Sequence, residues 1–402
     1  MLSLEQALEK LLGATTPLAE SESLSTFDAL GRVLAEGVVS ALDVPPHDNS
    51  SMDGYAVRVA DVAAAAGGVL RVSQRIAAGQ VGAVLEAGTA ARIFTGAALP
   101  AGADAVVMQE QCEAADGGVR IAALPLPGQW IRRRGEDVRR QSLMLERGSR
   151  LTPQALGLAA SVGAARLQVV RRPRVALFST GDELVMPGEP LPPGAIYNSN
   201  RYTLRALLLA LGCEVNDLGI VADRLDATRQ MLRHAAADCD LILTSGGVSV
   251  GEEDHLKPAV QAEGRLDLWQ IAIKPGKPLA FGEVRREGGG HALFIGLPGN
   301  PVSSFVTFLL AVRPVLLALQ GAEPGLPAAL ALRADFDWPV PDARREFLRV
   351  RRNATGGLEP YPNQSSGVLT SAVWADGLLD NPPGRAFARG DMVRFLPFSD
   401  LV

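Results

Sequence analysis

The sequence predicts a multidomain protein of mixed α/β class, because its texture changes several times along 402 residues. Solid apolar runs alternate with helical segments in residues 173–321, a pattern typical of a parallel, doubly wound sheet. Short alternating strands and Gly-rich turns fill residues 46–137, which indicates a compact β domain. Short strands with many prolines in residues 322–402 predict a small C-terminal β domain.

The N-terminal segment and a later segment share a helical pattern. MLSLEQALEKLLG places leucines at helical spacing after Ser3, a residue type that caps helices. LTPQALGLAASVGAARL, which begins at Leu151, has similar periodicity and a proline near its start. We therefore predict that residues 1–45 and 138–172 form one elongated, discontinuous helical domain, into which the β domain 46–137 is inserted.

The α/β region supplies the clearest elements. Strands are expected at 174–180, 213–221 and 240–247 and from 291, and helices at 201–212 and 228–238 and from Pro301. Gly212 is a stop signal for the first of these helices. Ligands of such sheets bind beyond the carboxyl ends of the strands, so the loops that follow the strands are candidate sites.

The composition argues against several classes of function. A formal net charge of -5 does not favour a general nucleic-acid binder. Arg313 and Pro314 interrupt FVTFLLAVRPVLLAL, which is too short and too broken for a predicted membrane span. Cys112, Cys213 and Cys239 have no CxxC spacing, so we expect buried thiols in a reduced, cytoplasmic protein. The four histidines lack metal-ligand spacing, which argues against a zinc enzyme.

The loop TSGGVSVGEEDHLK follows the strand at 240–247. It begins with residues that have small side chains or none: Ser245, Gly246 and Gly247. We expect their backbone N–H groups to lie close to a bound phosphate. Helix capping is the better interpretation of Glu252 and Glu253. For Asp254, which also follows the glycine loop, we favour a functional role.

Carboxylates at several strand ends predict a magnesium site. FSTGDELV supplies Asp182 and Glu183, and Asp223 follows another strand. Together with Asp254 they could converge on Mg²⁺, which prefers oxygen ligands and often keeps substrate phosphates. Each acid alone is better explained by a cap or a turn, and the convergence of several acids is what favours a metal site.

Further loops carry anion-binding residue types. Asn300 before Pro301 is suited to start a helix, and a helix start at a strand end can bind an anion. In IKPGKPLAFG, Lys274 and Lys277 flank a Pro-Gly turn. We favour binding of an oxyanion by these lysines over a solvent-exposed turn without a ligand. Asp53 in DNSSMDGYAVR also fits an Asx-type turn, and PNQSSGVLTS alone fits any loop.

In their order, these motifs resemble the molybdopterin molybdotransferase family, the MoeA family, which is related to the E domain of gephyrin. The motifs are DNSSMDGYAVR, RIFTGAALPAGADAVVMQE, RRRGEDV, FSTGDEL, TSGGVSVGEEDHLK, IKPGKP, PGNPVSSF and PNQSSGVLTS. The resemblance covers nearly the whole chain, and it implies that residues 173–321 form a molybdopterin-binding domain.

The resemblance implies the last step of molybdenum cofactor assembly. Adenylylated molybdopterin and molybdate would be the substrates, molybdenum would join the dithiolene sulfurs, and AMP would leave with Mg²⁺ present. It also implies an elongated homodimer, in which the α/β domain of one subunit faces the β domain of the other. Docking of a molybdopterin adenylyltransferase and the choice between molybdate and tungstate stay open.

The resemblance assigns roles to individual positions. Matches to the family's functional residues are Asp53, Thr95, Asp137, Glu183, Asp223, Asp254, Lys274, Lys277 and Ser365 or Ser366. Arg345 is expected to contact molybdate, with Pro275 nearby. We expect Glu183, Asp223 and Asp254 to organise Mg²⁺, and Asp53 to act in trans.

Two rival functions fit less well. An enzyme resembling the competence-damage family would contain the α/β region without MDGYA or the C-terminal domain, and both are present. A scaffold like neuronal gephyrin would carry a second molybdopterin-binding domain and a long linker, whereas TSGGVS occurs once in this chain.

Overall fold

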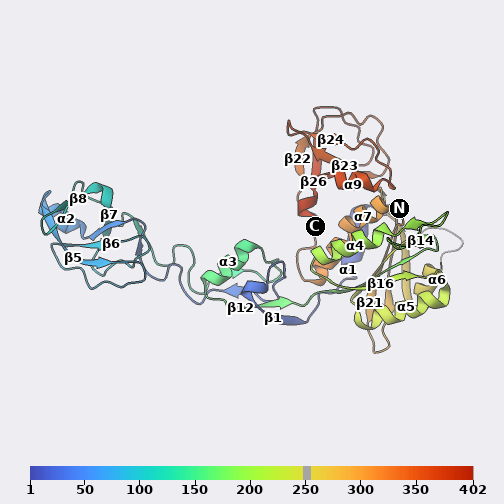
Figure 1. The fold of residues 1–402 in the computed structure, drawn as a ribbon, viewed down its shortest axis with the longest axis horizontal. Coiled ribbons are helices and arrows are strands. Elements are labelled where there is room, and N and C mark those ends of the chain that lie inside the picture. Colours follow the sequence, from blue (N-terminus) through green and yellow to red (C-terminus); the bar gives the residue numbers. More distant parts are fainter. Residues whose placement is uncertain (248–254, 402) are drawn as a thin grey trace.

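The chain forms an elongated molecule with its mass at the two ends. The computed structural model describes residues 1–247 and 255–401. A β domain lies at one end, a slender middle unit follows, and an α/β unit that carries the C-terminal β unit lies at the other end (Figure 1). Both chain termini lie at this second end (Figure 1).

The α/β unit is built on a six-stranded sheet. Its order is β16 (Glu214–Val221), β13 (Arg174–Thr180), β17 (Leu241–Ser245), β21 (His291–Leu297), β20 (Pro278–Arg285) and β18 (Gly264–Gln270). The first four strands are parallel, as predicted, and β20 and β18 continue the sheet in antiparallel pairing. A short parallel pair, β14 (Leu184–Val185) and β15 (Ile196–Tyr197), follows β13.

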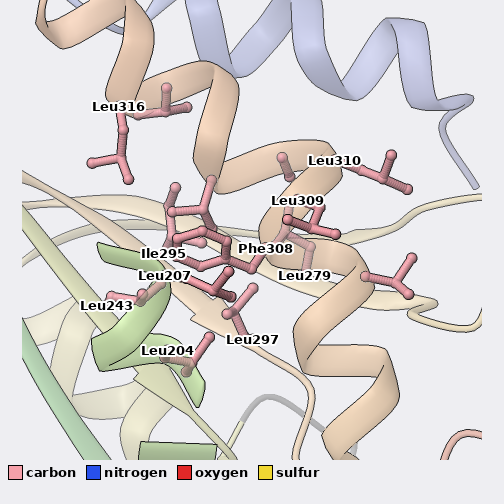
Figure 2. Packing of buried hydrophobic residues seen from close by; sticks show 14 of the residues in the cluster. Leu204, Leu207, Leu243, Leu279, Ile295, Leu297, Phe308, Leu309, Leu310 and Leu316 are labelled. Carbon is pink, nitrogen blue, oxygen red and sulfur yellow. The ribbon is translucent and has the colours of Figure 1, made fainter. Parts of the chain in front are cut away.

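Helices cover both faces of this sheet and bury two separate apolar clusters. On one face, α4 (Ser199–Ala210) packs with α7 (Pro301–Thr307) and α8 (Arg313–Leu319). Figure 2 shows side chains of this cluster between α4, the sheet and the helix formed by residues 301–319. On the other face lie α5 (Leu225–Asp238) and α6 (Leu256–Glu263). Burial of these large apolar side chains stabilises each layer by about 1.5–3 kcal/mol per side chain.

The apolar segment that starts at Pro301 forms one helix through Leu319, so our expectation that Pro314 interrupts it is wrong. A π-helical turn, Phe308–Val312, joins α7 to α8 just before Pro314. Such a turn changes the local hydrogen-bond pattern, which relieves the conflict of a proline inside a helix. This helix is long and apolar enough to cross a membrane, but 83% of its most apolar window is buried inside the protein. It is the core helix of the α/β unit.

Helix α1 (Leu4–Gly13) belongs to the core of the α/β unit, whereas we grouped it with residues 138–172. Its capping box at Ser3 agrees with the predicted cap. The apolar face of α1 places Leu4 and Leu11 in the cluster of α4 and α8, where they are 2% and 0% exposed. Burial against that cluster decides its place, since helical periodicity alone does not specify a partner.

The middle unit contains more strand than the predicted helical domain. Its elements are β1 (Ser21–Ser25) paired with β12 (Arg166–Val170), β2 (Val38–Val39) paired with β11 (Leu143–Leu145), a 3₁₀ turn (Thr26–Asp28), and α3 (Pro153–Ser161). The segment that precedes the inserted β domain in the sequence thus pairs with the segment that follows it. The prediction of a mainly helical unit failed because long-range strand pairing fixed these segments.

The β domain is a six-stranded sheet. Its order is β7 (Ala105–Met108), β4 (Gly54–Val57), β6 (Thr89–Ile93), β5 (Val69–Ile76), β9 (Gly118–Ile121) and β8 (Cys112–Ala115), with α2 (Val59–Ala65), a 3₁₀ turn (Gln109–Gln111), and the pair β3 (Asn49–Ser50) and β10 (Ile131–Arg132) beside it. Apolar clusters lie on both faces of the sheet.

The C-terminal unit takes a strand from the α/β region. Its sheet has the order β19 (Ile273–Lys274), β23 (Arg345–Arg352), β25 (Gly377–Asn381), β26 (Met392–Pro397) and β22 (Leu330–Arg333), with β24 (Leu358–Pro360) beside β23, α9 (Leu369–Trp374) and a 3₁₀ turn (Phe398–Asp400). Because β19 pairs with β23, the lysine loop is tied to the C-terminal unit.

Candidate active site

A cavity of about 770 Å³ lies beyond the carboxyl ends of the four parallel strands. Residues that end or follow these strands line it: Thr180, Asp223, Ser245 and Asn300. Neighbouring parallel strands lead to helices on opposite faces of the sheet, so their loops diverge at this edge. The divergence opens the crevice in which doubly wound sheets bind ligands.

The loop after β17 needs glycine at two positions, because it lies too close to β13 to leave room for a side chain. Gly246 has φ +91°, and an added Cβ would lie 2.9 Å from the carbonyl oxygen of Thr180. Gly247 has φ +65°, and its Cβ would lie 2.9 Å from the Thr180 hydroxyl. Both glycines line the cavity. A bare backbone therefore lets this loop lie against β13 while it faces the cavity.

Two of the three predicted magnesium ligands line the cavity. Glu183 and Asp223 come from the loops after β13 and β16. Asp254 lies outside the described residues, as do Glu252 and Glu253. Within residues 1–247 and 255–401 there is no group of three or more metal-ligating side chains. Two carboxylates still fit Mg²⁺, since this ion is usually held by one or two carboxylates together with substrate phosphates and water.

Ser245 and Asn300 occupy the cavity wall in different ways. Ser245 is 3% exposed, and its hydroxyl lies 3.2 Å from that of Ser179 on the adjacent strand. Asn300 takes the cap position of α7, but its side chain makes no capping bond, contrary to our expectation. Its side chain is exposed at the cavity instead.

The structure separates the two lysines of the IKPGKP loop. Lys274 Nζ lies 3.3 Å from Asp342 Oδ2 and 3.4 Å from Glu346 Oε1, and Glu346 is fully buried. Lys277 is exposed, and no hydrogen bond or ion pair of its side chain occurs within the described part of the chain. Pro275 is buried between them, and Pro278 lines the cavity. Lys277 is therefore the lysine of this loop that is available to an incoming anion.

Arg345 is engaged by two carboxylates. Its Nε and Nη2 donate to Asp380 at 2.5 and 2.7 Å, and its Nη1 donates to Glu5 at 2.5 Å. Arg345 pairs with Ile273 in the sheet, so it lies beside the lysine loop as expected. The predicted molybdate contact would have to compete with Glu5, whose side chain is 70% exposed.

The NQSSG loop reaches the cavity from the C-terminal unit. Gly367 lines the cavity, and the carbonyl oxygen of Ser366 accepts a hydrogen bond of 3.0 Å from Val302 N at the start of α7. Ser365 is exposed and Ser366 is half-buried. The loop thus brings the two predicted serines to the edge of the site.

Asp53 and Thr95 form a pair in the β domain. The backbone N–H and hydroxyl of Thr95 donate to Asp53 Oδ1 at 2.8 and 2.7 Å. These hydrogen bonds hold the pKa of Asp53 below its usual value. The β domain lies at the far end of the molecule from the α/β unit (Figure 1). Asp137, predicted to bind substrate, is exposed where the β domain joins the middle unit and does not line the cavity.

The YNSN segment, residues 197–200, runs from the end of β15 into the start of α4 and was missed by the sequence prediction. Tyr197, Asn198 and Asn200 all line the cavity. Asn198 caps α4 by accepting a hydrogen bond from Arg201 N, and Asn200 Nδ2 donates to the carbonyl oxygen of Gly299 at 2.8 Å. Small polar residues between a strand end and a helix start are the signal that could have identified this segment.

The thiols stand apart from the cavity lining. Cys213 and Cys239 are buried as predicted, but Cys112 is only half-buried. Burial raises the pKa of Cys213 to about 12 and that of Cys112 to about 11. These thiols are poor nucleophiles near neutral pH.

Comparison with known proteins places these features in one family. Residues 2–163 match the MoeA N-terminal region (domain I and II), residues 176–318 a probable molybdopterin binding domain, and residues 331–398 the MoeA C-terminal region (domain IV).

Relatives and a solved structure match over most or all of the chain. A molybdopterin molybdenumtransferase of Haemophilus influenzae is 45% identical over 100% of both chains. One of Nostoc sp. is 36% identical over 92% of this chain and 86% of that protein. A crystal structure of the molybdopterin biosynthesis moeA protein from Pyrococcus horikoshii aligns with TM-score 0.84 and 28% identity, covering 98% of this chain and 99% of that one. The chain belongs to the MoeA family.

Proposed function

We propose that this protein is a molybdopterin molybdenumtransferase that inserts molybdenum from molybdate into adenylylated molybdopterin and releases AMP. The observation that carries this proposal is the cavity of about 770 Å³ at the divergent strand ends, with its glycine loop and two carboxylates. Full-length relatives that carry this enzyme name support the same reaction. The substrate would bring its own dithiolene sulfurs, so no cysteine nucleophile is needed.

The cavity residues, together with Lys277, which directly precedes the cavity-lining Pro278, have roles that differ by charge. The backbone of Gly246 and Gly247 admits the phosphate of the substrate, and Asn300 offers a neutral polar group beside it. Lys277 supplies a positive charge that stabilises the negative charge developing on the departing AMP. Glu183 and Asp223 would hold Mg²⁺, which supplies charge neutralisation at the phosphate when bound.

The active form would be a homodimer that brings two half-sites together. Asp53 and Thr95 form a compact polar pair but lie in the distant β domain (Figure 1). A second subunit could place this pair opposite the cavity of the first. The site would then contain residues of both subunits.

The test of this function is AMP release from adenylylated molybdopterin with Mg²⁺, measured with and without molybdate. We expect release that depends on molybdate, together with molybdenum on the pterin. No AMP release by the folded dimer would contradict the proposal.

Asp223→Ala should lower the rate of AMP release by about 100-fold, which corresponds to about 2.7 kcal/mol of lost charge stabilisation at the phosphate. Asp226→Ala is the matched control, because Asp226 is exposed three residues along in the first turn of α5 and does not line the cavity. Full AMP release by the Asp223 variant would end the assignment of this residue.

A further inference from the structure

Arg92, in β6, is a half-buried cation of the β domain that the proposed reaction does not yet use. Its guanidinium lies over two aromatic rings, 5.3 Å from the centroid of Tyr55 and 4.5 Å from that of Phe94. The guanidinium of Arg75, its partner on β5, lies over the same Phe94 ring at 4.5 Å. Aromatic faces attract cations, so these contacts restrict the Arg92 side chain to one place on the sheet.

The fork of the Arg92 guanidinium supports the backbone next to Asp53. Nη1 donates to the carbonyl oxygen of Gly54 at 2.9 Å, and Nη2 donates to Gln109 Oε1 at 2.6 Å. The backbone N–H of Gln109 in turn donates to the carbonyl oxygen of Asp53 at 3.0 Å. Within residues 1–247 and 255–401, Arg92 forms no ion pair with a carboxylate. Its two bonds therefore tie two points of the backbone around Asp53 to one side chain.

The other support of Asp53 adjoins the same aromatic contacts. Phe94 directly precedes Thr95, whose backbone N–H and hydroxyl both donate to Asp53 Oδ1. The hydrogen bonds from Thr95 lower the pKa of Asp53, and the nearby charge of Arg92 contributes in the same direction. Asp53 Oδ2 accepts no hydrogen bond from the part of the chain that the structure describes. One carboxylate oxygen is thus fixed, and the other is left for an incoming group.

We propose that Arg92 is a positioning residue that orients the Asp53 carboxylate for an active site shared between two subunits. It holds the backbone of Asp53 through Gly54 and Gln109, and Oδ2 of Asp53 then points to the substrate held by the partner subunit. This inference rests on the proposed function, in which Asp53 acts in trans. Arg92 itself acts through Asp53 and has no contact with the substrate.

Steady-state kinetics of AMP release by the full-length protein test this role. Arg92→Met removes both hydrogen bonds next to Asp53 and leaves the cavity unchanged. We therefore expect kcat to fall about tenfold while the KM for adenylylated molybdopterin stays within about threefold. Arg92→Lys keeps the charge but cannot form both bonds of the planar fork, so kcat should fall only about threefold.

Arg71→Met is the matched control in the same sheet. Arg71, on β5, pairs with Glu86 at the surface and has no bond to Asp53 or its neighbours. A folded Arg92→Met variant whose kcat and KM equal those of this control would overturn the proposal. Should Arg92→Met fail to fold, an unchanged kcat in Arg92→Lys would overturn it.

A double substitution distinguishes a positioning role from a direct one. When Arg92 acts only through Asp53, Arg92→Met has no further effect on the residual kcat of the Asp53→Asn protein. A further loss of about tenfold in the double variant would show that Arg92 acts on the substrate or on the whole fold, and it would overturn the proposal.

Amide hydrogen exchange tests the same inference without the reaction. The backbone N–H groups of Thr95 and Gln109 both donate to Asp53. Arg92→Met should therefore speed their exchange about tenfold relative to Arg71→Met. Equal exchange in these two variants would overturn the role of Arg92. Absence of AMP release by the unsubstituted protein would refute the reaction, whereas faster exchange would still show that Arg92 holds Asp53 in place.

Discussion

A single threonine stabilises the ionised form of Asp53 in the β domain. Both donors of Thr95 reach the same oxygen of Asp53, and they lower the pKa of this carboxyl. A lowered folded pKa means that the stabilisation is present above the unfolded pKa and is lost as the pH falls through the folded pKa. The two hydrogen bonds therefore keep Asp53 ionised to lower pH than an unpaired aspartate.

Thr95→Val should raise the pKa of Asp53 toward its usual value, because the hydroxyl donor is lost and the backbone donor is kept. We expect the acid limb of the pH–rate profile for AMP release to move to higher pH. Thr89→Val is the control, since this hydroxyl bonds Glu86 and Ser73 and does not touch Asp53. A profile that coincides with that of the control would show that Asp53 ionisation does not limit the rate.

Some residue contacts could not be predicted from local patterns. Motif order identified Asp53 and Thr95 as functional candidates, but only the pairing of β4 with β6 brings them together. Arg345 meets Glu5, which lies 340 positions away in the chain. The sequence of a motif does not reveal which acidic side chain forms an ion pair with its basic residue, because ion pairs depend on tertiary packing.

At the scale of elements, the alternation of apolar runs and helices predicted the four parallel strands and the edge at which the cavity lies. It did not predict that β18 and β20 extend the sheet in antiparallel pairing, or that β19 joins the C-terminal sheet. An apolar run specifies burial, whereas its partner and direction depend on distant strands.

The turn after β17 depends on glycine for its path. Gly246→Ala should destabilise the protein by about 1–3 kcal/mol, because the new Cβ meets Thr180 at a strained φ. Urea unfolding measures this change. Gly288→Ala is the control, since no atom lies within 4 Å of its Cβ position and its φ is not in the left-handed region. Equal midpoints for the two variants would contradict the steric account.

At the scale of the whole molecule, the β domain, which contains Asp53, and the α/β unit, which contains the cavity, lie at opposite ends (Figure 1). The proposed homodimer therefore predicts complementation between subunits. Asp53→Asn and Asp223→Asn homodimers should each be nearly inactive. An equal mixture refolded together should recover about a quarter of native AMP release, because half of the dimers are mixed and each has one intact site. Recovery no greater than the sum of the two variants would indicate that each site lies within one subunit.

The N-terminal helix has a consequence for synthesis of the chain. Helix α1 packs with α8, and Leu18 N donates to the carbonyl oxygen of Leu319 at 2.8 Å. The ribosome makes α1 before α4, α7 and α8, against which it packs, so its binding surface is complete only after most of the following chain has emerged. The β domain can fold during this interval, because its strands are contiguous in sequence. The apolar face of α1 therefore stays exposed, and open to aggregation, until the helices of the α/β unit fold and bury it.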